Sequence, residues 1–369
     1  MNASKRQRRA RAALASLASL LLGVSLPAAA ATFTVNSTSD SPDADVADGV
    51  CADAQGLCTL RAAIMQANAL GGDNVIDLSQ INDPSNPIVL TLAGADETAT
   101  GNGADGFQVV ATHDAGKGDL NITSSMEIIG AGSDKTIIEW SPEVRQSPAS
   151  GDRVFHIEAV SSNIAVTISG VTIENGVTPA PQKLQDLPGG AFYQLERSGA
   201  GIAIGTAAAV TYVNPASSGT KEGGGGGGSS GGNGGSGSGG SGSDEGGGPG
   251  SGGEEQGAET SATITGVVLS DVRVLNNQSG AAGGGISSAA PLTLDNVLVS
   301  GNTAATNGGG IYNDAQLTVV NSTIGAMSGF PAGNSAEGGG GRPESRKRRE
   351  RHPSARSRSV VDPEHGPAA

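Results

Sequence analysis

The chain has 369 residues, of which 60 are glycine, and aromatic side chains make up only 2% of it. This composition excludes an ordinary globular domain, because a thick core needs many large apolar and aromatic side chains. The formal net charge is −14 over the whole chain and −23 over residues 32–341, where 32 Asp and Glu stand against 9 Lys and Arg. A surface this acidic repels nucleic acid and anionic membranes, so neither is an expected partner.

Residues 1–31 have the pattern of a secretory signal peptide. Five basic residues precede the apolar segment 12–26, and "PAAAAT" supplies small residues for cleavage after Ala30 or Ala31. The apolar segment is shorter than the ~20 residues that cross a bilayer, and no second segment of that length follows it. The sequence therefore predicts a secreted or cell-surface protein whose mature chain has no transmembrane helix.

Residues 32–72 form a predicted N-terminal region that holds both cysteines and one amphipathic helix. A threonine suits the N-cap position, and a Gly-Gly pair supplies the stop. Cys51 and Cys58 enclose a short loop, and a disulfide between them would contribute about 2.5 kcal/mol in an oxidising compartment. Metal binding by the two thiols is the weaker interpretation, because no His or further Cys lies nearby. The residues expected to cap and build the helix are Thr59, Leu60, Arg61, Ala63, Ile64 and Ala67.

Four aspartates precede the cysteine loop, namely Asp40, Asp43, Asp45 and Asp48. Carboxylate oxygens are the ligands that calcium prefers, so these residues are a candidate calcium site. Their spacing departs from that of an EF-hand loop, which favours the alternative of a solvated acidic loop. Calcium is the only cofactor that the sequence suggests.

A repeat of about 25 residues marks the later part of the predicted coil region, residues 73–341. The alternating runs within each copy have three to five residues, which is too short for a free-standing sheet. Stacked turns would let each short strand pair with its equivalents in the neighbouring turns, so we predict an all-β fold: a right-handed parallel β-helix, or solenoid, with an N-terminal α-helical cap. Matching positions are Leu292 and Leu317, Thr293 and Thr318, and Asn296 and Asn321, and triple-glycine blocks begin at Gly283 and Gly308.

Asparagines recur between the short runs of each copy. Asn296, Asn302 and Asn321 are predicted to occupy coil corners, where the backbone adopts angles that asparagine and glycine tolerate. Asn296 and Asn321 are also expected to stack as a ladder, because they occupy the same position in successive copies.

Two segments break the repeat pattern. Residues 219–260 contain almost nothing to bury and are predicted to be a disordered Gly/Ser-rich loop extruded from one coil. The flanking segments 189–213 and 263–275 have the pattern of coil strands. Residues 342–369 are basic and lack an apolar period, so we hypothesise that a frameshift or premature end has replaced further coils there.

The chain resembles the secreted bacterial proteins that carry a CSLREA-type N-terminal region ahead of a right-handed parallel β-helix. The likeness rests on residues 33–69, on "GDLNIT", "IIGAGSDKTII" and "DRVFHI", and on the Gly-Gly-Gly-Ile repeats, which are also similar to polymorphic outer-membrane protein repeats. The motif reads Cys-Thr-Leu-Arg-Ala-Ala at Cys58–Ala63, where Ala62 replaces the Glu that would complete a capping box. The resemblance implies that residues 49–72 are a structural end cap, since a parallel stack otherwise exposes a sheet edge and its core.

Catalytic residues are not evident in the sequence. Polysaccharide hydrolysis needs two carboxylates facing one cleft, and elimination needs a base beside a cation held by acidic residues. His156 alternates with apolar Phe155 and Ile157, which predicts that it faces out of a strand, and His113 has no evident partner. None of the basic residues outside the cap and the loop is predicted to lie in an acidic cluster: Lys117, Lys135, Arg145, Arg153, Lys183, Arg197 and Arg273.

The expected function is that of an exported, non-catalytic surface or extracellular protein that adheres or binds a ligand through a repetitive face. Many weak contacts from equivalent coil positions would add by multivalency. The partner would be an extracellular protein or a polysaccharide. A carbohydrate-active β-helix enzyme, either a polysaccharide lyase or a hydrolase, is the alternative, and its catalytic residues stay unassigned.

Overall fold

A computed structural model describes residues 30–94, 97–102, 106–111, 113–143, 151–187, 190–205, 208–213, 262–330 and 333–338. The predicted signal peptide up to residue 29, the Gly/Ser-rich loop 219–260, Arg145 and the basic tail 342–369 lie outside these residues. The described residues form mostly parallel strands in stacked sheets, together with one helix, α2 (Leu60–Leu70). Within the same ranges, no helix has the length and hydropathy needed to cross a membrane.

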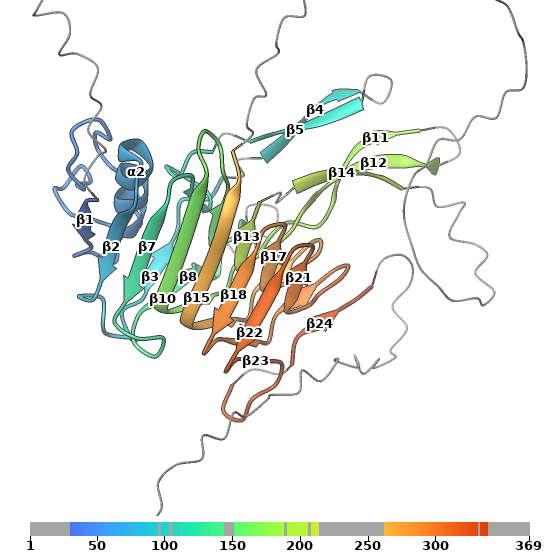
Figure 1. The fold of residues 1–369 in the computed structure, drawn as a ribbon. Helices are drawn as coiled ribbons and strands as arrows, with labels where there is room; N and C mark the ends of the chain where they lie inside the picture. The colour runs from blue at the N-terminus through green and yellow to red at the C-terminus, as the bar shows by residue number, and fades with distance from the viewer. Residues whose placement is uncertain are drawn as a thin grey trace, which may run out of the picture. The chain divides into compact units, whose positions relative to one another are not determined.

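The main path of the largest sheet takes one strand from each successive turn of the chain (Figure 1). All of its pairings are parallel, and Leu292 lies directly opposite Leu317, which confirms the predicted repeat period. The main path runs through β1 (Thr32–Thr34), β2 (Asn74–Leu78), β7 (Met126–Gly130), β10 (Ile164–Glu174), β15 (Ile264–Leu275), β18 (Leu292–Asp295) and β22 (Leu317–Val320). Beside this path lie β3 (Ile88–Leu90), β8 (Ile137–Trp140), β19 (Leu298–Ser300) and β23 (Thr323–Ile324).

Two further parallel sheets follow the same succession of turns. The first consists of β6 (Leu120–Ile122), β9 (Phe155–Ile157), β13 (Ile202–Ile204), β17 (Ile286–Ser288) and β21 (Ile311–Asn313). The second consists of β16 (Gln278–Ser279), β20 (Thr303–Ala304) and β24 (Ser335–Ala336). Such short strands gain stability only from neighbours above and below, so this arrangement agrees with the predicted solenoid.

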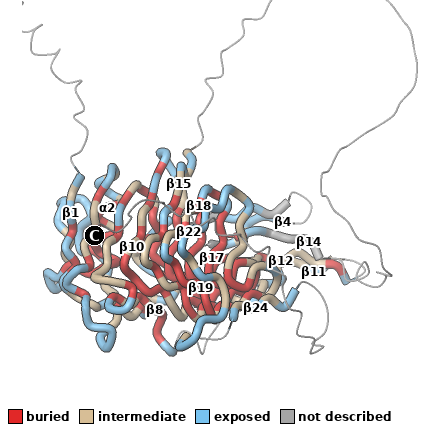
Figure 2. The backbone as a smooth tube through the Cα atoms, turned by 60° about the horizontal axis from the view of Figure 1, so that its bottom comes forward, coloured by how far each residue is buried: buried red, intermediate tan, exposed pale blue. Residues whose placement is uncertain are grey.

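Alternate residues of the strands form the core of the stack. Successive side chains of a strand point to opposite faces, so equivalent residues of paired strands line up in columns. In Figure 2 the buried backbone follows the stacked strands. Full burial of each Ile or Leu contributes about 1.5–3 kcal/mol, and the columns therefore replace the thick aromatic core of a globular domain. One column of the largest sheet consists of Phe33, Ile76, Ile128, Ile168, Leu269 and Leu294, all buried.

One junction in the stack joins strands that are far apart in sequence. Thr167 of β10 lies opposite Val268 of β15. The Thr265 hydroxyl donates a hydrogen bond to the carbonyl oxygen of Ile164, which lies 101 residues earlier in the chain. Part of the intervening chain forms an antiparallel sheet of β11 (Gln182–Asp186), β12 (Phe192–Arg197) and β14 (Ala208–Val213). The prediction that residues 189–213 supply coil strands is therefore correct for β13 and wrong for β12 and β14. Alternation of apolar and polar residues is common to both kinds of strand, so it does not reveal strand direction.

A second antiparallel element interrupts the stack earlier in the chain. Strands β4 (Glu97–Asn102) and β5 (Gly106–Ala111) form a hairpin, and β5 contacts β14 of the antiparallel sheet. Both elements project from the parallel sheets (Figure 1), so the stack carries side structures that its repeat does not predict.

Two of the predicted corner asparagines have left-handed backbone angles. Asn296 has a φ of 55° and Asn321 a φ of 50°, while Asp271, one turn earlier, has a φ of 51°. Asn and Asp tolerate this region better than other residues with a side chain. The Asn296 amide donates to Oδ1 of Asp271 at 3.4 Å, so this hydrogen bond joins Asn296 to the preceding turn.

The third predicted corner asparagine, Asn302, is buried in a hydrogen-bonded ladder with Asn277 and Asn334. Nδ2 of Asn277 donates to Oδ1 of Asn302 at 2.9 Å, and Nδ2 of Asn302 donates to Oδ1 of Asn334 at 3.0 Å. The backbone N–H groups of Asn277 and Asn302 donate to the same two oxygens, each at 3.0 Å. Each rung therefore satisfies backbone and side-chain groups that are removed from water.

Gly284 allows two turns of backbone to touch. A Cβ atom added there would lie 2.2 Å from the carbonyl oxygen of Gly309 and 2.3 Å from that of Thr303. We expect Gly284→Ala to lower the free energy of unfolding by about 3 kcal/mol, because the backbone must move to admit the methyl group. Gly266→Ala is the control, since nothing lies within 4 Å of a Cβ added there, and it should change stability by less than about 0.5 kcal/mol. Urea denaturation measures both, and equal losses would contradict the close contact.

The asparagine ladder is tested at its middle rung. Asn302→Ala removes the oxygen that accepts two hydrogen bonds from Asn277, which leaves buried donors without that partner. We expect a loss of about 3 kcal/mol in the free energy of unfolding. Asn307→Ala changes an exposed asparagine of the same turn and should have an effect below about 0.5 kcal/mol. If thermal or urea denaturation finds the two variants equally stable, the ladder has no specific role in stability.

Candidate functional site

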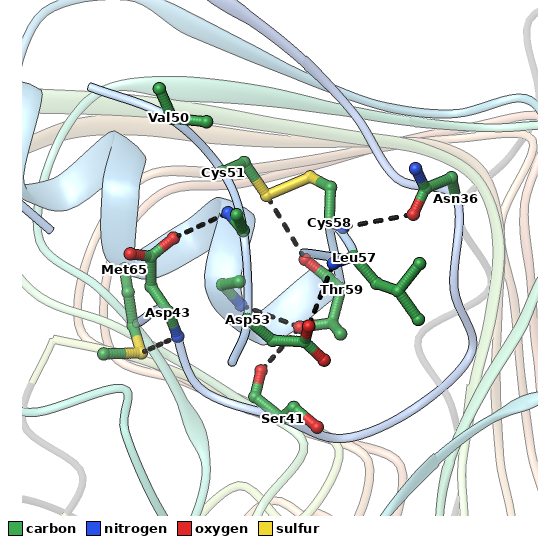
Figure 3. The surroundings of a disulfide bond; sticks show 12 residues. Asn36, Ser41, Asp43, Val50, Cys51, Asp53, Leu57, Cys58, Thr59 and Met65 are labelled. Atoms are coloured by element: carbon green, nitrogen blue, oxygen red, sulfur yellow. Dashed lines mark hydrogen bonds between the residues drawn. A yellow bond between two sulfur atoms is a disulfide. The ribbon is translucent and has the colours of Figure 1, made fainter. Parts of the chain in front are cut away.

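The N-terminal region is fastened by the predicted disulfide, which joins Cys51 and Cys58 (Figure 3). The backbone N–H of Cys58 donates to Oδ1 of Asn36 at 3.1 Å, so the cysteine loop is tied to the segment that follows β1. Asp53 lies within the loop and accepts from the N–H groups of Gln55 and Leu57, each at 2.9 Å. The loop is therefore held by its own backbone and by the first strand.

Helix α2 begins directly after Thr59, as predicted. The Thr59 hydroxyl accepts from the N–H of Ala62 at 3.0 Å and donates to the carbonyl of Ser41 at 2.6 Å. The helix ends at Leu70, where Gly71 adopts a left-handed φ of 67°. The helix contacts strands β2 and β6. Its buried residues include Leu60, Arg61, Ala63, Ile64 and Ala67.

The aspartates of the candidate calcium site each have a partner within the protein. Asp40 forms an ion pair with Arg61, and the other three accept hydrogen bonds from backbone N–H groups within residues 45–52. The four residues are Asp40, Asp43, Asp45 and Asp48. Among the residues that the structure describes, no group of three or more His, Cys, Asp and Glu could hold a metal ion.

Arg61 links the acidic segment and the helix to a later part of the chain. Its Nε lies 2.5 Å from Oδ1 of Asp40, and both side chains are buried. Its guanidinium also donates to the carbonyl oxygens of Ala115 at 2.6 Å and Gly118 at 3.0 Å. These partners are 54 and 57 residues away, so sequence reasoning identified Arg61 as a helix residue without finding its contacts.

A second group of charges is buried beside strand β9. Nη1 of Arg153 lies 2.9 Å from Oδ2 of Asp119 and 3.7 Å from Oδ1 of Asp152. Nδ1 of His156 lies 3.9 Å from Oδ2 of Asp119 and 3.8 Å from Oε1 of Glu158. The prediction that Arg153 lies outside any acidic cluster is therefore wrong, because these partners converge from different turns.

The surroundings of His156 also correct the sequence-based expectation. The residue is buried, and its Nε2 lies 3.1 Å from the carbonyl oxygen of Gly205, so it does not face out of the strand into solvent. Alternation within β9 cannot reveal that residues 119, 158 and 205 pack on this side. His113 likewise has a partner, since its Nδ1 pairs with Oε1 of Glu158.

This charged group is closed to substrates. The side chains of Asp119 and Arg153 have no exposed surface, and that of His156 is almost fully covered. Opposite charges that are hydrogen-bonded to one another offset the cost of removing them from water. The arrangement therefore fits a structural role between turns better than catalysis.

Glu158 also lines a cavity of about 530 Å³. Its other lining residues are small, apolar or hydroxyl-bearing and come from segments 159, 205, 262–264 and 289–291. Glu158 is the one charged residue among them, and its carboxylate is engaged by His113. Among the described residues that line the cavity, there is thus no second carboxylate of the kind that glycoside hydrolysis requires.

A second cavity, here called the corner groove, has a volume of about 290 Å³. It lies at the corner of the stack where the backbone has left-handed φ angles. Asp271, Asn296 and Asn321 contribute to it from three successive turns, at equivalent positions of the repeat. Its lining also includes the paired positions Arg273, Leu298 and Thr323 of the same turns. The repeat therefore builds one side of this groove.

Asp271 is held in place within the corner groove. Its carboxylate accepts from the N–H of Ser133 at 3.2 Å, from the Ser133 hydroxyl at 2.9 Å and from Nδ2 of Asn296 at 3.4 Å. Three donors from two other turns fix the orientation of this negative group. A fixed carboxylate beside amides suits ligands that carry hydroxyl or N–H groups.

Arg273 supplies a positive charge next to an aromatic ring. Its guanidinium carbon lies 5.2 Å from the centroid of the Phe330 ring, within the range of a cation–π contact. Together with Asp271 and the two corner asparagines, the groove offers both charges, amides and one ring. Sequence reasoning named Asn296, Asn321 and Arg273, while Asp271 could have been found because it stands one repeat before Asn296.

Two side chains outside this groove have shifted pKa values. The hydrogen bond with Asp314, together with partial burial, raises the pKa of Tyr312. Hydrogen bonds from the side chain and backbone of Ser85 lower the pKa of Asp83. Because neither residue lines the corner groove, neither shift bears on proton exchange there.

Comparisons with protein-family models, with curated proteins and with solved structures found no match for this chain. The likeness to CSLREA-type proteins and to polymorphic outer-membrane protein repeats therefore rests on the sequence motifs alone. The structure supports the coarser statement that the described residues are mainly parallel strands in stacked sheets.

The contacts of Arg61 predict a large effect on stability. Arg61→Ala would leave Asp40 buried without its charged partner, so we expect the free energy of unfolding to fall by about 3–5 kcal/mol. The control is Lys183→Ala, because Lys183 pairs with Asp186 at an exposed site, where a loss below about 1 kcal/mol is expected. Guanidinium denaturation followed by circular dichroism compares the two, and similar losses would contradict the assigned role of Arg61.

Proposed function

We propose that this chain is an exported, non-catalytic surface or extracellular protein that binds a protein or a polysaccharide through the corner groove and the repeated face beside it. The observation that carries the proposal is the alignment of Asp271, Asn296 and Asn321 from successive turns along one hollow. Equivalent residues of paired strands are about 4.8 Å apart, so a repetitive ligand could meet the same chemistry at each turn.

The repeated face supports binding by many weak contacts. Outward positions beside the buried columns include Thr167, Val268, Thr293 and Thr318, which lie in register across four strands. None of these four side chains carries a charge, so a neutral or hydroxyl-rich surface can approach them without desolvating an ion. The neutral stretch is bounded by Glu127, which lies opposite Thr167, and by Asp295 on the same face of β18. Individually weak contacts at fixed spacing add through multivalency.

Export is supported by the N-terminal features. The predicted signal peptide precedes a region with a disulfide, and disulfides persist mainly in oxidising compartments outside the cytoplasm. The net negative charge of the chain also disfavours binding to nucleic acid. Secretion or cell-surface display remains part of the proposal.

The finer features of the fold belong to the same proposal. We assign a right-handed coil, since crossover connections between parallel strands of one sheet are overwhelmingly right-handed. We assign α2 and the disulfide loop the role of an end cap, because Phe33 and Val35 of the first turn are buried. The CSLREA-type motif at residues 58–63 supports this role, and membership in that family is proposed on this motif.

A carbohydrate-active enzyme is the less favoured alternative. Among the lining residues of each cavity described above there is one carboxylate, Glu158 in the first and Asp271 in the corner groove. Both carboxylates are engaged by partners, and hydrolysis by the usual route needs two that flank the scissile bond. Binding without turnover therefore fits the corner groove better.

The test uses the chain from residue 32 onward on an array of extracellular polysaccharides and immobilised surface proteins. We expect at least one binder, and Arg273→Ala should weaken its affinity at least tenfold, because the variant loses the charge and the Phe330 stacking of the groove. Lys117→Ala is the control, because this exposed lysine lies outside the groove and should not change affinity.

Three results would contradict this function. One is an array on which the chain binds nothing, and another is equal affinity of the Arg273→Ala and Lys117→Ala variants. The third is release of reducing ends or unsaturated products from a bound polysaccharide, which would favour the enzyme.

A further inference from the structure

The last described turn of the stack leaves its core face uncovered. Leu317 and Val319 of β22 are 38% and 41% exposed, whereas Leu292 and Leu294, which lie opposite them in β18, are 1% and 0% exposed. The same two columns of the core therefore pass from full burial to solvent within a single turn. Side chains of this size that belong to a core column mark a surface that requires a partner.

The backbone of this turn is equally uncovered. Among the described strands, β22 ends the main path of the largest sheet, and β21 and β24 end the other two parallel sheets. The sequence of β22, Leu-Thr-Val-Val, contains no charge and no proline to protect its edge. A neutral strand at the end of a sheet favours pairing with another strand.

The opposite end of the stack differs because its core is covered. Strand β1 ends the sheet there, but its Phe33 is 6% exposed, the following Val35 is not exposed at all, and helix α2 contacts the neighbouring strands β2 and β6. Head-to-tail stacking would place the uncovered Leu317 and Val319 against a covered core, so contact between two uncovered ends buries more apolar surface. Contact between two identical open ends is isologous and stops at two copies.

We propose that two copies of this chain associate end to end through β22, related by a two-fold axis. The two β22 strands pair antiparallel, as the axis requires, and Leu317 and Val319 of each copy cover those of the other. Residues 342–369 of the sequence are a poor alternative occupant, because they are rich in arginine and lack the apolar alternation of a strand. A neutral edge paired with itself brings no like charges into direct contact.

The charge of the chain sets the conditions under which this dimer is strongest. The two strongly acidic bodies repel each other at low ionic strength, while the neutral contact itself is insensitive to salt. Dimerisation should therefore strengthen as sodium chloride rises from low to physiological concentration. A contact made by the basic tail on an acidic surface would weaken under the same change.

The experiment is sedimentation equilibrium and light scattering of the chain from residue 32 onward over a range of concentrations. The expected result is a monomer–dimer equilibrium with no larger species. Val319→Lys should raise the dissociation constant at least tenfold, because each contact would have to bury two ammonium groups. Val268→Lys is the matched control, since Val268 is 37% exposed in the middle of the same sheet, and its dimer should be unchanged.

Circular dichroism establishes that both variants are folded, and hydrogen exchange of the β22 amides provides a second readout. In the wild-type chain, protection of these amides should rise with protein concentration. A wild-type monomer at all concentrations, protection that is independent of concentration, an unaffected Val319→Lys dimer, or growth beyond two copies would each overturn the proposal.

Discussion

In-register pairing of short parallel strands is the constraint on which this structure depends. Strands such as β18 and β22 have four residues each, and neither could form a sheet alone. A shift of one residue would turn Leu292 and Leu294 out of the core and turn their polar neighbours into it. The constant interval between equivalent positions is therefore fixed by the core, and both the corner groove and the repeated face follow from it.

Buried polar groups add specificity to this pairing. In the ladder of Asn277, Asn302 and Asn334, a side-chain oxygen of one turn accepts a hydrogen bond from a backbone N–H of the preceding turn. These bonds form only when neighbouring turns are correctly aligned along the stack. Arg61 and Arg153 act in a similar way at the N-terminal part of the stack, where each binds groups from other turns. Columns of Val, Ile and Leu would tolerate small rotations that these directional bonds do not.

The sequence allowed the period, the helix and the disulfide to be predicted, because each is a local or regularly spaced pattern. The pairing of Leu292 with Leu317 follows directly from the repeat. Asn334 was missed as a ladder residue, since it follows Asn302 by 32 residues, which is longer than the repeat. The environments of Arg153 and His156 were predicted wrongly because their partners, Asp119 and Gly205, come from other turns. The corner groove could be predicted only in part, because its asparagines belong to the repeat but Ser133 and Phe330 do not.

The junction between β10 and β15 has a consequence for how the chain acquires its structure. Turns joined at a single repeat close small loops, whereas β10 and β15 must find each other across 101 residues. By the logarithmic dependence of loop entropy on length, this closure costs about 1.2 kcal/mol more than that of an ordinary turn. We therefore expect the turns before and after this junction to form from near neighbours, and the pairing of β10 with β15 to be a slow step of folding.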